Sequence, residues 1–274
     1  MRLRRFRSTW LPISILSLGL SALLVLAACS DDNSAVQRDA APADVLVVDQ
    51  RVDLLRADLA ADLAPSRDTA GVPLPGFGAL MGDCGVLDDT EWSAASSPFY
   101  FRNAIDFGAA AFDETKLSAG GQKVFTDGNL GGNSLHSEVF SYEVLYRCEL
   151  ATLLKTEKDI TYLDDGGKKT DLLVEIDGRK VGVSVTRAFH YPPGQPYTEA
   201  EARTLLEKKL PDVLASAANA KAEDAWERSM LHVIAADAQH ADVVKTAYDQ
   251  LDPQVRANTL LLVTVTDGKD DYIY

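Results

Sequence analysis

The stretch KTDLLVEIDGRKVGVSVTRA, residues 169–188, carries the clearest structural signal in this chain. Two apolar runs rich in β-branched residues flank Asp177 and Gly178, and a two-residue Asp-Gly loop between such runs is typical of a β-hairpin. If the loop consists of these two residues alone, Asp171 at the start of the first strand lies opposite Ser184 on the second. The stretch therefore predicts a hairpin with a defined register.

This register divides the hairpin into an apolar and a polar face. Residues that oppose each other, and residues two apart along a strand, share a face of the sheet. On the polar face Leu173 pairs with Gly182, whose missing side chain should leave space beside Asp171 and Ser184. The other face is core and consists of Leu172, Val174, Ile176, Val181, Val183 and Val185.

The hydrophobic pattern around the hairpin alternates between helical and strand periods from Ser134 onward. It predicts helices over 134–154, from Thr198 through 210 and over 241–251, and strands over 158–167, 170–176, 180–188, 228–238 and 258–268. Thr198 and Glu201 form a capping box, and Pro211 should kink or end the helix that they start. The order α-β-β-β-α-β-α-β predicts an α/β domain over 134–274, with a mixed central sheet and helices on both faces.

Two regions of different composition precede this domain. Residues 76–133 are rich in Gly, Ser and Asp with short aromatic runs, which predicts a small β/loop lead-in with two or three short strands. In residues 29–75, Asp recurs among Ala, Leu and Val, prolines are frequent and aromatic residues are absent. This composition predicts an acidic, disordered tether.

The first residues have the organisation of a secretory signal peptide. A basic segment, MRLRRFR, precedes an apolar run that ends in small residues at position 28. Leu26-Ala27-Ala28-Cys29 resembles the lipobox of bacterial lipoproteins, which implies that Cys29 is acylated, for example with palmitate, and becomes the mature N-terminus. We therefore expect a lipoprotein of the bacterial cell envelope, anchored to a membrane on the periplasmic or surface side. An ordinary secretory signal with a chance cysteine and an uncleaved anchor helix are the alternatives.

The charge of the mature chain argues against nucleic acid as a partner. Cleavage after residue 28 removes Arg2, Arg4, Arg5 and Arg7 and no acid, so the net charge moves from −14 to about −18. A uniformly acidic surface lacks the electrostatic attraction that supplies most non-specific nucleic-acid affinity.

Two cysteines remain after Cys29, at positions 84 and 148. In an oxidising compartment Cys84 and Cys148 are expected to form a disulfide that joins the lead-in to the first helix of the domain. Two separate thiols are the alternative. A zinc site is not expected, because the sequence has no CxxC and no cluster of Cys and His.

The element order, together with Asp171 at the entry of a central strand, resembles the restriction-endonuclease-like superfamily, the PD-(D/E)XK fold. The core of that fold is a helix, a three-stranded meander, a helix and a further strand. The resemblance implies that an acid early in the second strand and a Glu/Asp-x-Lys in the third bind a divalent metal. It also implies that an acid on the first helix joins them and that the lysine orients the attacking water. Carboxylates suit Mg²⁺, which stabilises charge on phosphoryl oxygens.

Part of this motif is present in the chain. Asp171 matches the first acid, and Glu138 or Glu143 matches the helix acid, so Glu138 and Asp171 are the candidate metal ligands. Where the acid-x-lysine should stand, the chain has Ser184-Val185-Thr186, and neither hydroxyl supplies the missing charge. A lysine would have to reach the site from elsewhere, and the candidates are Lys169, Lys208 and Lys209.

These residues also have purely structural explanations. Asp171 can cap the entry of its strand or pair with Lys169, and Lys208 and Lys209 can form the solvated side of a helix. His232, which alternates with apolar neighbours in MLHVI, is expected to be a hydrogen-bonded histidine of the sheet and not a catalyst.

Two functions follow for the domain. The missing acid-x-lysine and the negative charge favour a non-catalytic module, derived from a nuclease, that binds an unknown protein partner. The alternative is a Mg²⁺-dependent nuclease or phosphodiesterase with a migrated lysine, which would use Glu138, Asp171 and one of the three lysines. No other cofactor is expected.

Overall fold

The computed structural model describes residues 72–74, 77–93, 99–109, 111–190, 195–267 and 273. The signal peptide, Cys29 and nearly all of the tether lie outside these residues. Within the described ranges, no helix combines the length and the apolar character needed to cross a bilayer.

The hairpin lies where the sequence predicts it. Strand β5 (Leu172–Ile176) pairs antiparallel with β6 (Arg179–Ala188), and the register places Leu173 opposite Gly182. Asp177 and Gly178 have φ values of 51° and 72°, the left-handed conformation that a tight two-residue hairpin loop requires. The predicted loop and register are confirmed.

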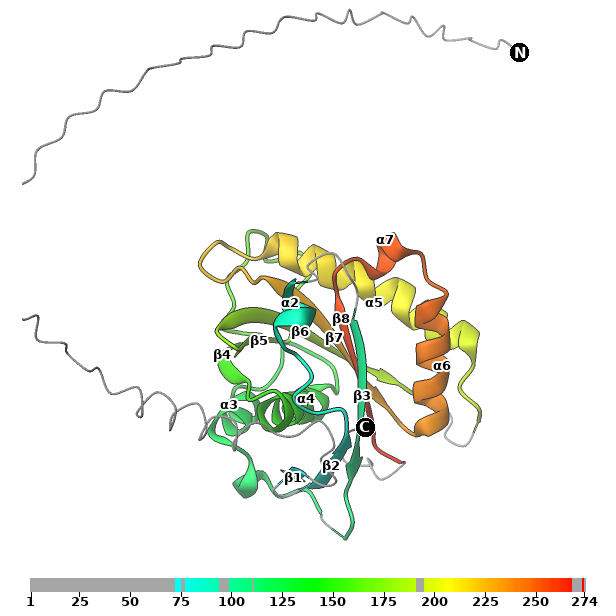
Figure 1. The fold of residues 1–274 in the computed structure, drawn as a ribbon. Helices are drawn as coiled ribbons and strands as arrows, with labels where there is room; N and C mark the ends of the chain where they lie inside the picture. Colours follow the sequence, from blue (N-terminus) through cyan, green and yellow to red (C-terminus); the bar gives the residue numbers. More distant parts are fainter. Residues whose placement is uncertain are drawn as a thin grey trace, which may run out of the picture. The chain divides into compact units, whose positions relative to one another are not determined.

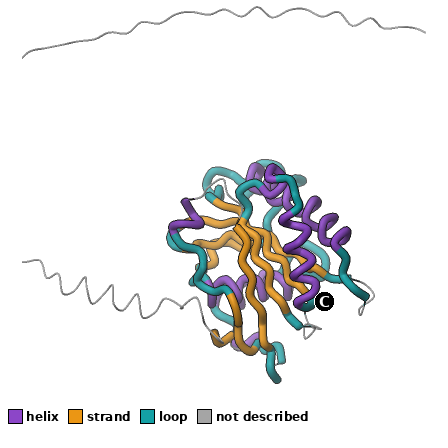
Figure 2. The backbone as a smooth tube through the Cα atoms, turned by 45° about the vertical axis from the view of Figure 1, so that its right-hand side comes forward, coloured by secondary structure: helices purple, strands orange, loops and turns teal. Residues whose placement is uncertain are grey.

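The hairpin belongs to an eight-stranded mixed sheet with the order β1-β2-β3-β8-β7-β6-β5-β4. The other strands are β1 (Val72–Leu74), β2 (Gly78–Gly82), β3 (Phe99–Asp106), β4 (Thr152–Thr156), β7 (Arg228–Ala235) and β8 (Leu260–Val265). Strands β3, β8, β7 and β6 are parallel, and the strands outside them pair antiparallel. Figure 2 shows these strands side by side in one twisted sheet.

Helices cover both faces of this sheet, as predicted (Figure 1). Below one face, α4 packs against Val174, Val183 and neighbouring apolar residues. On the opposite face α5 and α6 pack against Leu231 and Val233. From Ser134 the chain forms α4, β4, β5, β6, α5, β7, α6 and β8, with short α7 between the last two, which confirms the predicted order. The helical segments are α2 (Asp89–Ser93), η1 (Glu114–Lys116), α3 (Ala119–Asp127), α4 (Leu135–Cys148), α5 (Glu199–Asn219), α6 (Ala238–Asp249) and α7 (Pro253–Arg256).

The first helix and the first strand of this order end earlier than predicted. Helix α4 stops at Cys148, and Leu150 adopts a left-handed φ of 52° that a continuing helix excludes. The strand that follows is β4 at Thr152–Thr156, and the predicted strand at 158–167 was wrong. Those residues form turns and a single bridge from Tyr162 to Ala220. The apolar spacing in ELATLL is compatible with a helix, so this spacing does not reveal that α4 ends at Cys148 and that a strand begins at Thr152. The left-handed backbone at Leu150 marks the change from helix to strand.

Helix α5 begins as predicted but does not end at its proline. Thr198 and Glu201 form the capping box, and the helix runs through Pro211 to Asn219. A proline removes one helical hydrogen bond, but the flanking Leu210 and Val213 are both buried against the sheet. This burial offsets the loss and carries the helix past the proline.

The strands before Ser134 extend the central sheet. Strand β3 pairs in parallel with β8, from Phe99 opposite Leu260 to Ala104 opposite Val265. Cys84, just after β2, forms the predicted disulfide with Cys148 at the end of α4. The lead-in is therefore joined to the α/β domain by a strand ladder and by a covalent bond.

Candidate functional site

Three carboxylates converge beside the hairpin. Glu138 lies in the first turn of α4, Glu157 directly after β4, and Asp171 directly before β5. Each offers one oxygen, and the three oxygens lie within 4.8 Å of one another. The structure thus brings together the two acids predicted from the sequence and adds a third.

Each acid is oriented by a hydrogen bond from a different part of the chain. The hydroxyl of Ser134 donates to Glu138 over 2.8 Å, and the backbone amide of Leu130 donates to Glu157 over 2.7 Å. Asp171 accepts a hydrogen bond from the backbone amide of Val185 on the neighbouring strand.

The pKa values of two acids in the cluster are raised, because the carboxylates are buried beside one another with little positive charge nearby. Burial raises the pKa of Asp171 to about 8, and the carboxylates of Glu138 and Glu157 add to the shift, although the residue keeps some solvent exposure. The amide of Val185 and the charge of Lys209 act in the opposite direction. The pKa of Glu138 is also raised, mainly by burial and further by Glu157. A bound cation would relieve this repulsion.

The third strand does not supply the charged pair of the PD-(D/E)XK motif. The hydroxyl of Ser184 lies 3.0 Å from that of Thr170 in a buried hydrogen bond. The space expected beside Gly182 is filled instead, because Trp226 lies against it and a Cβ atom there would fall 2.3 Å from the indole ring. The third carboxylate enters from the end of β4, through Glu157.

The three candidate lysines have different surroundings. The ammonium of Lys169 lies over the ring of Tyr162, 5.6 Å from its centroid. Lys208 lines a pocket between α5 and the end of β6. Lys209, which is partly buried on α5, lowers the pKa of Asp171 and so acts electrostatically on the cluster.

The other candidate helix acid lies elsewhere. Glu143 is fully buried and accepts hydrogen bonds from the amide and hydroxyl of Ser118, which caps α3. It therefore holds α3 against α4, and Glu138 alone represents the helix in the cluster.

Sequence reasoning missed Glu157 because it placed the strand too late. The acid follows TLLKT at the end of β4, a position that becomes visible only if the helix is ended at Cys148. Strand β4 lies next to β5 in the sheet, and Asp171 directly precedes β5. With the strand placed correctly, an acid at the end of β4 would have indicated the third carboxylate of the cluster.

The donor set suits a hard divalent cation. Carboxylate oxygens are the preferred ligands of Mg²⁺ and Ca²⁺, and two ligands on opposite sides of such an ion lie about 4–5 Å apart. The spacing of up to 4.8 Å among the three oxygens fits this range. Fold and cluster together define an α/β protein with a candidate metal centre at one end of the β5–β6 hairpin.

Comparison with known proteins gives partial similarities. No family model matches the chain. It is 39% identical over 153 residues to the AAC-rich mRNA clone AAC4 protein of Dictyostelium discoideum, a match that covers 54% of this chain. The match spans only 22% of the length of that relative. Among solved structures, SfsA of Pyrococcus furiosus in complex with Ca²⁺ covers 53% of this chain and 58% of its own, with 11% identity and a TM-score of 0.27.

Proposed function

We propose that the α/β domain is a divalent-metal-dependent phosphodiester hydrolase of the restriction-endonuclease-like kind. The observation that carries this proposal is the convergence of Glu138, Glu157 and Asp171, whose oxygens lie within 4.8 Å of one another. The order of helices and strands and the position of Asp171 at a strand entry support it, because both match the sequence resemblance.

The residues of the cluster have distinct roles in this proposal. Glu138, Glu157 and Asp171 hold Mg²⁺, which when bound supplies Lewis-acid stabilisation of charge on a phosphoryl oxygen. Lys209 takes the place of the missing strand lysine and orients the attacking water by hydrogen bonding. The amide of Val185 fixes the orientation of the Asp171 carboxylate.

The second candidate is a non-catalytic module that binds a protein partner. Ser184 and Thr186 occupy the positions of the acid and the lysine, and the hydroxyl of Ser184 is paired with that of Thr170. The net charge of −14 also disfavours a polyanionic substrate. In this case the three acids bind a structural ion, and hydrolysis is absent.

Hydrolysis of bis(p-nitrophenyl) phosphate and of a short single-stranded oligonucleotide, with Mg²⁺ or Mn²⁺ and with EDTA, separates the two candidates. We expect metal-dependent hydrolysis that falls at least about 100-fold in Asp171→Ala and Glu157→Gln, since outer-shell partners alone are worth about 10–100-fold. Glu175→Gln, an exposed acid on β5, is the matched control and should retain activity. Equal rates in the wild type and Asp171→Ala contradict the enzyme. Absence of metal-dependent hydrolysis in the wild type favours the binding module.

We also propose that the protein is a lipoprotein of the cell envelope, anchored through Cys29. The signal peptide and the lipobox-like Leu26-Ala27-Ala28-Cys29 support this, and the Cys84–Cys148 disulfide suits an oxidising compartment. In a bacterial host, labelling with an alkyne analogue of palmitate should mark the wild type and not Cys29→Ser. Equal labelling of both contradicts the anchor.

A further inference from the structure

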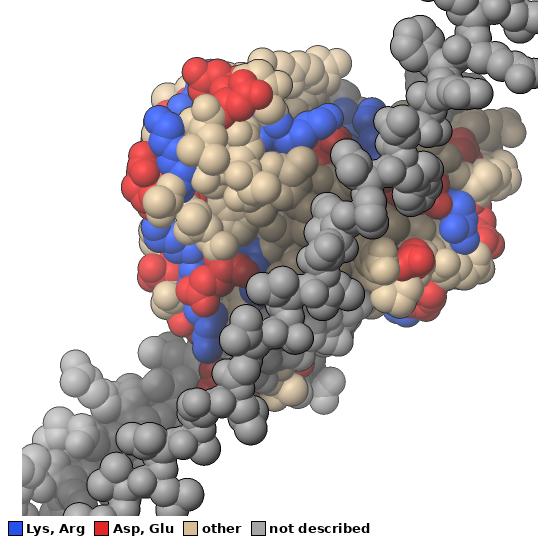
Figure 3. Space-filling view, turned by 90° about the horizontal axis from the view of Figure 1, so that it is seen from above, with Lys and Arg blue, Asp and Glu red and all other residues tan. Residues whose placement is uncertain are grey.

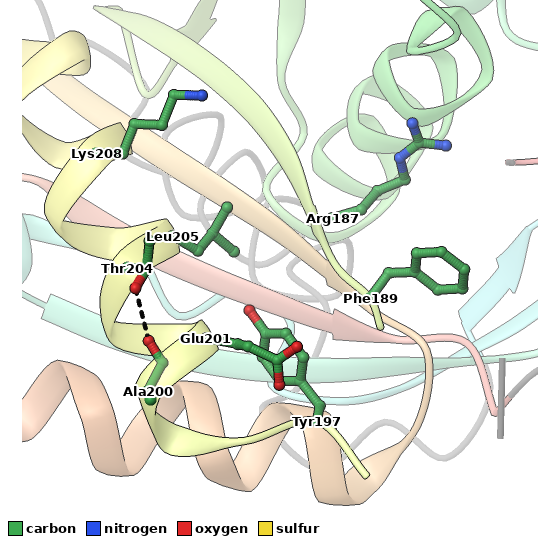
Figure 4. Close-up of a pocket in the computed structure, with 8 residues that line it drawn as sticks. All are labelled: Arg187, Phe189, Tyr197, Ala200, Glu201, Thr204, Leu205 and Lys208. Carbon is green, nitrogen blue, oxygen red and sulfur yellow. Dashed lines mark hydrogen bonds between the residues drawn. The ribbon is translucent and has the colours of Figure 1, made fainter. Parts of the chain in front are cut away.

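A pocket of about 430 Å³ lies between α5 and the end of β6. Figure 4 shows Arg187 and Phe189 at the end of β6, with side chains that extend away from α5, and Leu205 and Lys208 on α5, with Tyr197 nearby. Ligand pockets for small molecules generally have volumes of about 300–1,000 Å³, so this one can hold a single ring with its substituents.

The same two elements connect the pocket with the candidate metal centre. On β6, Arg187 lies just beyond Val185, whose amide donates to Asp171. On α5, Lys208 precedes Lys209, whose charge acts on Asp171. The pocket and the acid cluster therefore share β6 and α5 as supporting elements.

The lining of the pocket combines cations with flat apolar surface. Arg187 and Lys208 are the basic residues of the lining, and one guanidinium nitrogen of Arg187 is held 2.8 Å from the carbonyl of Ile273. The acid of the lining, Glu201, is engaged by the amide of Thr198 over 2.8 Å and by Nδ1 of His190 over 2.6 Å. Phe189, Tyr197 and Leu205 supply the apolar part. Such a lining suits a negatively charged group attached to a planar ring.

We propose that this pocket binds one unit of the substrate, a phosphate ester that carries a planar ring, such as a single nucleotide. The inference rests on the proposed hydrolase function and narrows its substrate to a short single strand or a dinucleotide. A duplex needs a broad basic surface, whereas the chain has a net charge of −14, and acidic and basic side chains are interspersed on the face shown in Figure 3.

Calorimetric titration of the full chain with adenosine 5′-monophosphate, in EDTA, tests the pocket directly. We expect Lys208→Ala to weaken binding by at least about tenfold, as for a lost charge-assisted hydrogen bond. Thr204→Trp, an exposed position of the lining, should block the pocket, and Lys221→Ala, an exposed lysine in the loop after α5, should bind like the wild type. Adenosine and inorganic phosphate should each bind more weakly than the nucleotide.

The possible outcomes separate the pocket from the hydrolase. Undetectable binding at millimolar nucleotide, equal affinity in Lys208→Ala and the wild type, or equal affinity for inorganic phosphate overturns the pocket assignment. Because EDTA removes divalent metal, the titration measures the pocket without the metal centre. A failed titration therefore does not contradict Asp171-dependent hydrolysis. Nucleotide binding that depends on Lys208 supports the pocket even if hydrolysis is absent, and that absence contradicts the hydrolase alone. Faster hydrolysis of duplex DNA than of a dinucleotide overturns the substrate class.

Discussion

At the scale of single residues, the candidate centre is assembled from three acids that are far apart in the chain. Glu138, Glu157 and Asp171 come from a helix start, a strand end and a strand entry, and each is held by a donor outside the cluster. Such an arrangement places like charges together, which opposes folding unless a cation is bound. The cluster is therefore expected to reduce the stability of the metal-free protein.

The first prediction is that Asp171→Asn stabilises the metal-free protein at pH 7. The raised pKa of Asp171, about 8, means that the folded state holds its proton more tightly than the unfolded chain. This contribution to stability is fully present below about pH 4 and is lost as the pH rises towards 8. The amide removes the loss, which is about 4 kcal/mol for the full shift at pH 7. Solvent screening of the partly exposed side chain reduces it, so the free energy of unfolding in EDTA should rise by about 2–4 kcal/mol.

Urea denaturation at pH 7 and pH 4 measures this effect. The difference between variant and wild type should shrink at pH 4, where the acid is protonated in the folded state and about half protonated in the unfolded chain. Mg²⁺ should stabilise the wild type more than the variant, because ligand binding to the folded state adds to its stability. A variant that is less stable than the wild type at pH 7 contradicts the prediction.

The second prediction concerns His232, which is buried in the sheet between two hydroxyl groups, as the sequence predicts for a histidine of the sheet. Its Nε2 lies 2.7 Å from the hydroxyl of Thr264, and its Nδ1 lies 2.8 Å from that of Ser141. Thr264 donates its proton to Asn103, so Nε2–H of His232 donates to Thr264 and Nδ1 accepts from Ser141. The ring is therefore neutral in the fold.

Burial lowers the pKa of His232 from 6.5 to about 3. The neutral ring contributes stability that is fully present above pH 6.5 and is lost as the pH falls towards 3, because the unfolded chain takes up the proton first. Between pH 7.5 and pH 5 the histidine should account for about 2 kcal/mol of lost stability. Urea denaturation of the wild type and His232→Gln at both pH values tests this. The same pH dependence in both proteins would contradict it.

At the scale of elements, an aromatic ring covers one face of the β5–β6 hairpin, a contact that the alternation of apolar and polar residues in the strands does not predict. Gly182 lies under Trp226, whose indole nitrogen donates to the hydroxyl of Ser229 over 2.9 Å. The absence of a side chain at Gly182 is required for this contact.

The third prediction is that Gly182→Ala lowers stability by about 1–3 kcal/mol, because its methyl group would overlap the indole ring and force it outward. Chemical denaturation gives the magnitude, and a shift in tryptophan emission would report movement of the ring. Gly131→Ala is the control, since a Cβ there meets nothing within 4 Å, and it should change stability by less than about 0.5 kcal/mol. A neutral Gly182→Ala contradicts the packing.

The sequence predicted elements well where local backbone chemistry determines them. The Asp-Gly loop specified the hairpin register, and Thr198 with Glu201 specified the start of α5. It predicted elements poorly where the apolar pattern fits more than one structure or where distant contacts decide. The end of α4 depends on the left-handed Leu150, and the continuation of α5 past Pro211 depends on burial against the sheet. Glu157 was missed for the first of these reasons.

At the scale of the whole molecule, the disulfide joins two parts of the chain that are far apart in the sequence. Cys84 and Cys148 are 64 residues apart and connect the region after β2 with the end of α4. Around this bond Asn103 donates a hydrogen bond to the carbonyl of Asp83, and Glu149 accepts from the amides of Gly85 and Leu87.

The fourth prediction is that the double variant Cys84→Ala, Cys148→Ala loses about 2–4 kcal/mol of unfolding free energy. Loop-closure entropy for a separation of this size is about 4 kcal/mol, and relaxation of the folded state reduces the measured value. Urea denaturation with and without reductant measures it. Reductant should destabilise the wild type to the level of the double variant and leave that variant unchanged. An effect of reductant on the variant would point to another thiol.

The position of β8 in the middle of the sheet has a consequence for how this protein folds during synthesis. Strand β3, near the start of the described fold, reaches the sheet only through β8, close to residue 265. Strands β1, β2 and β3 can pair with one another early, but they join the remaining strands only after β8 has been synthesised, and contacts of such long sequence separation form slowly. Until β8 has emerged from the ribosome, the edge of β3 that will pair with it stays exposed.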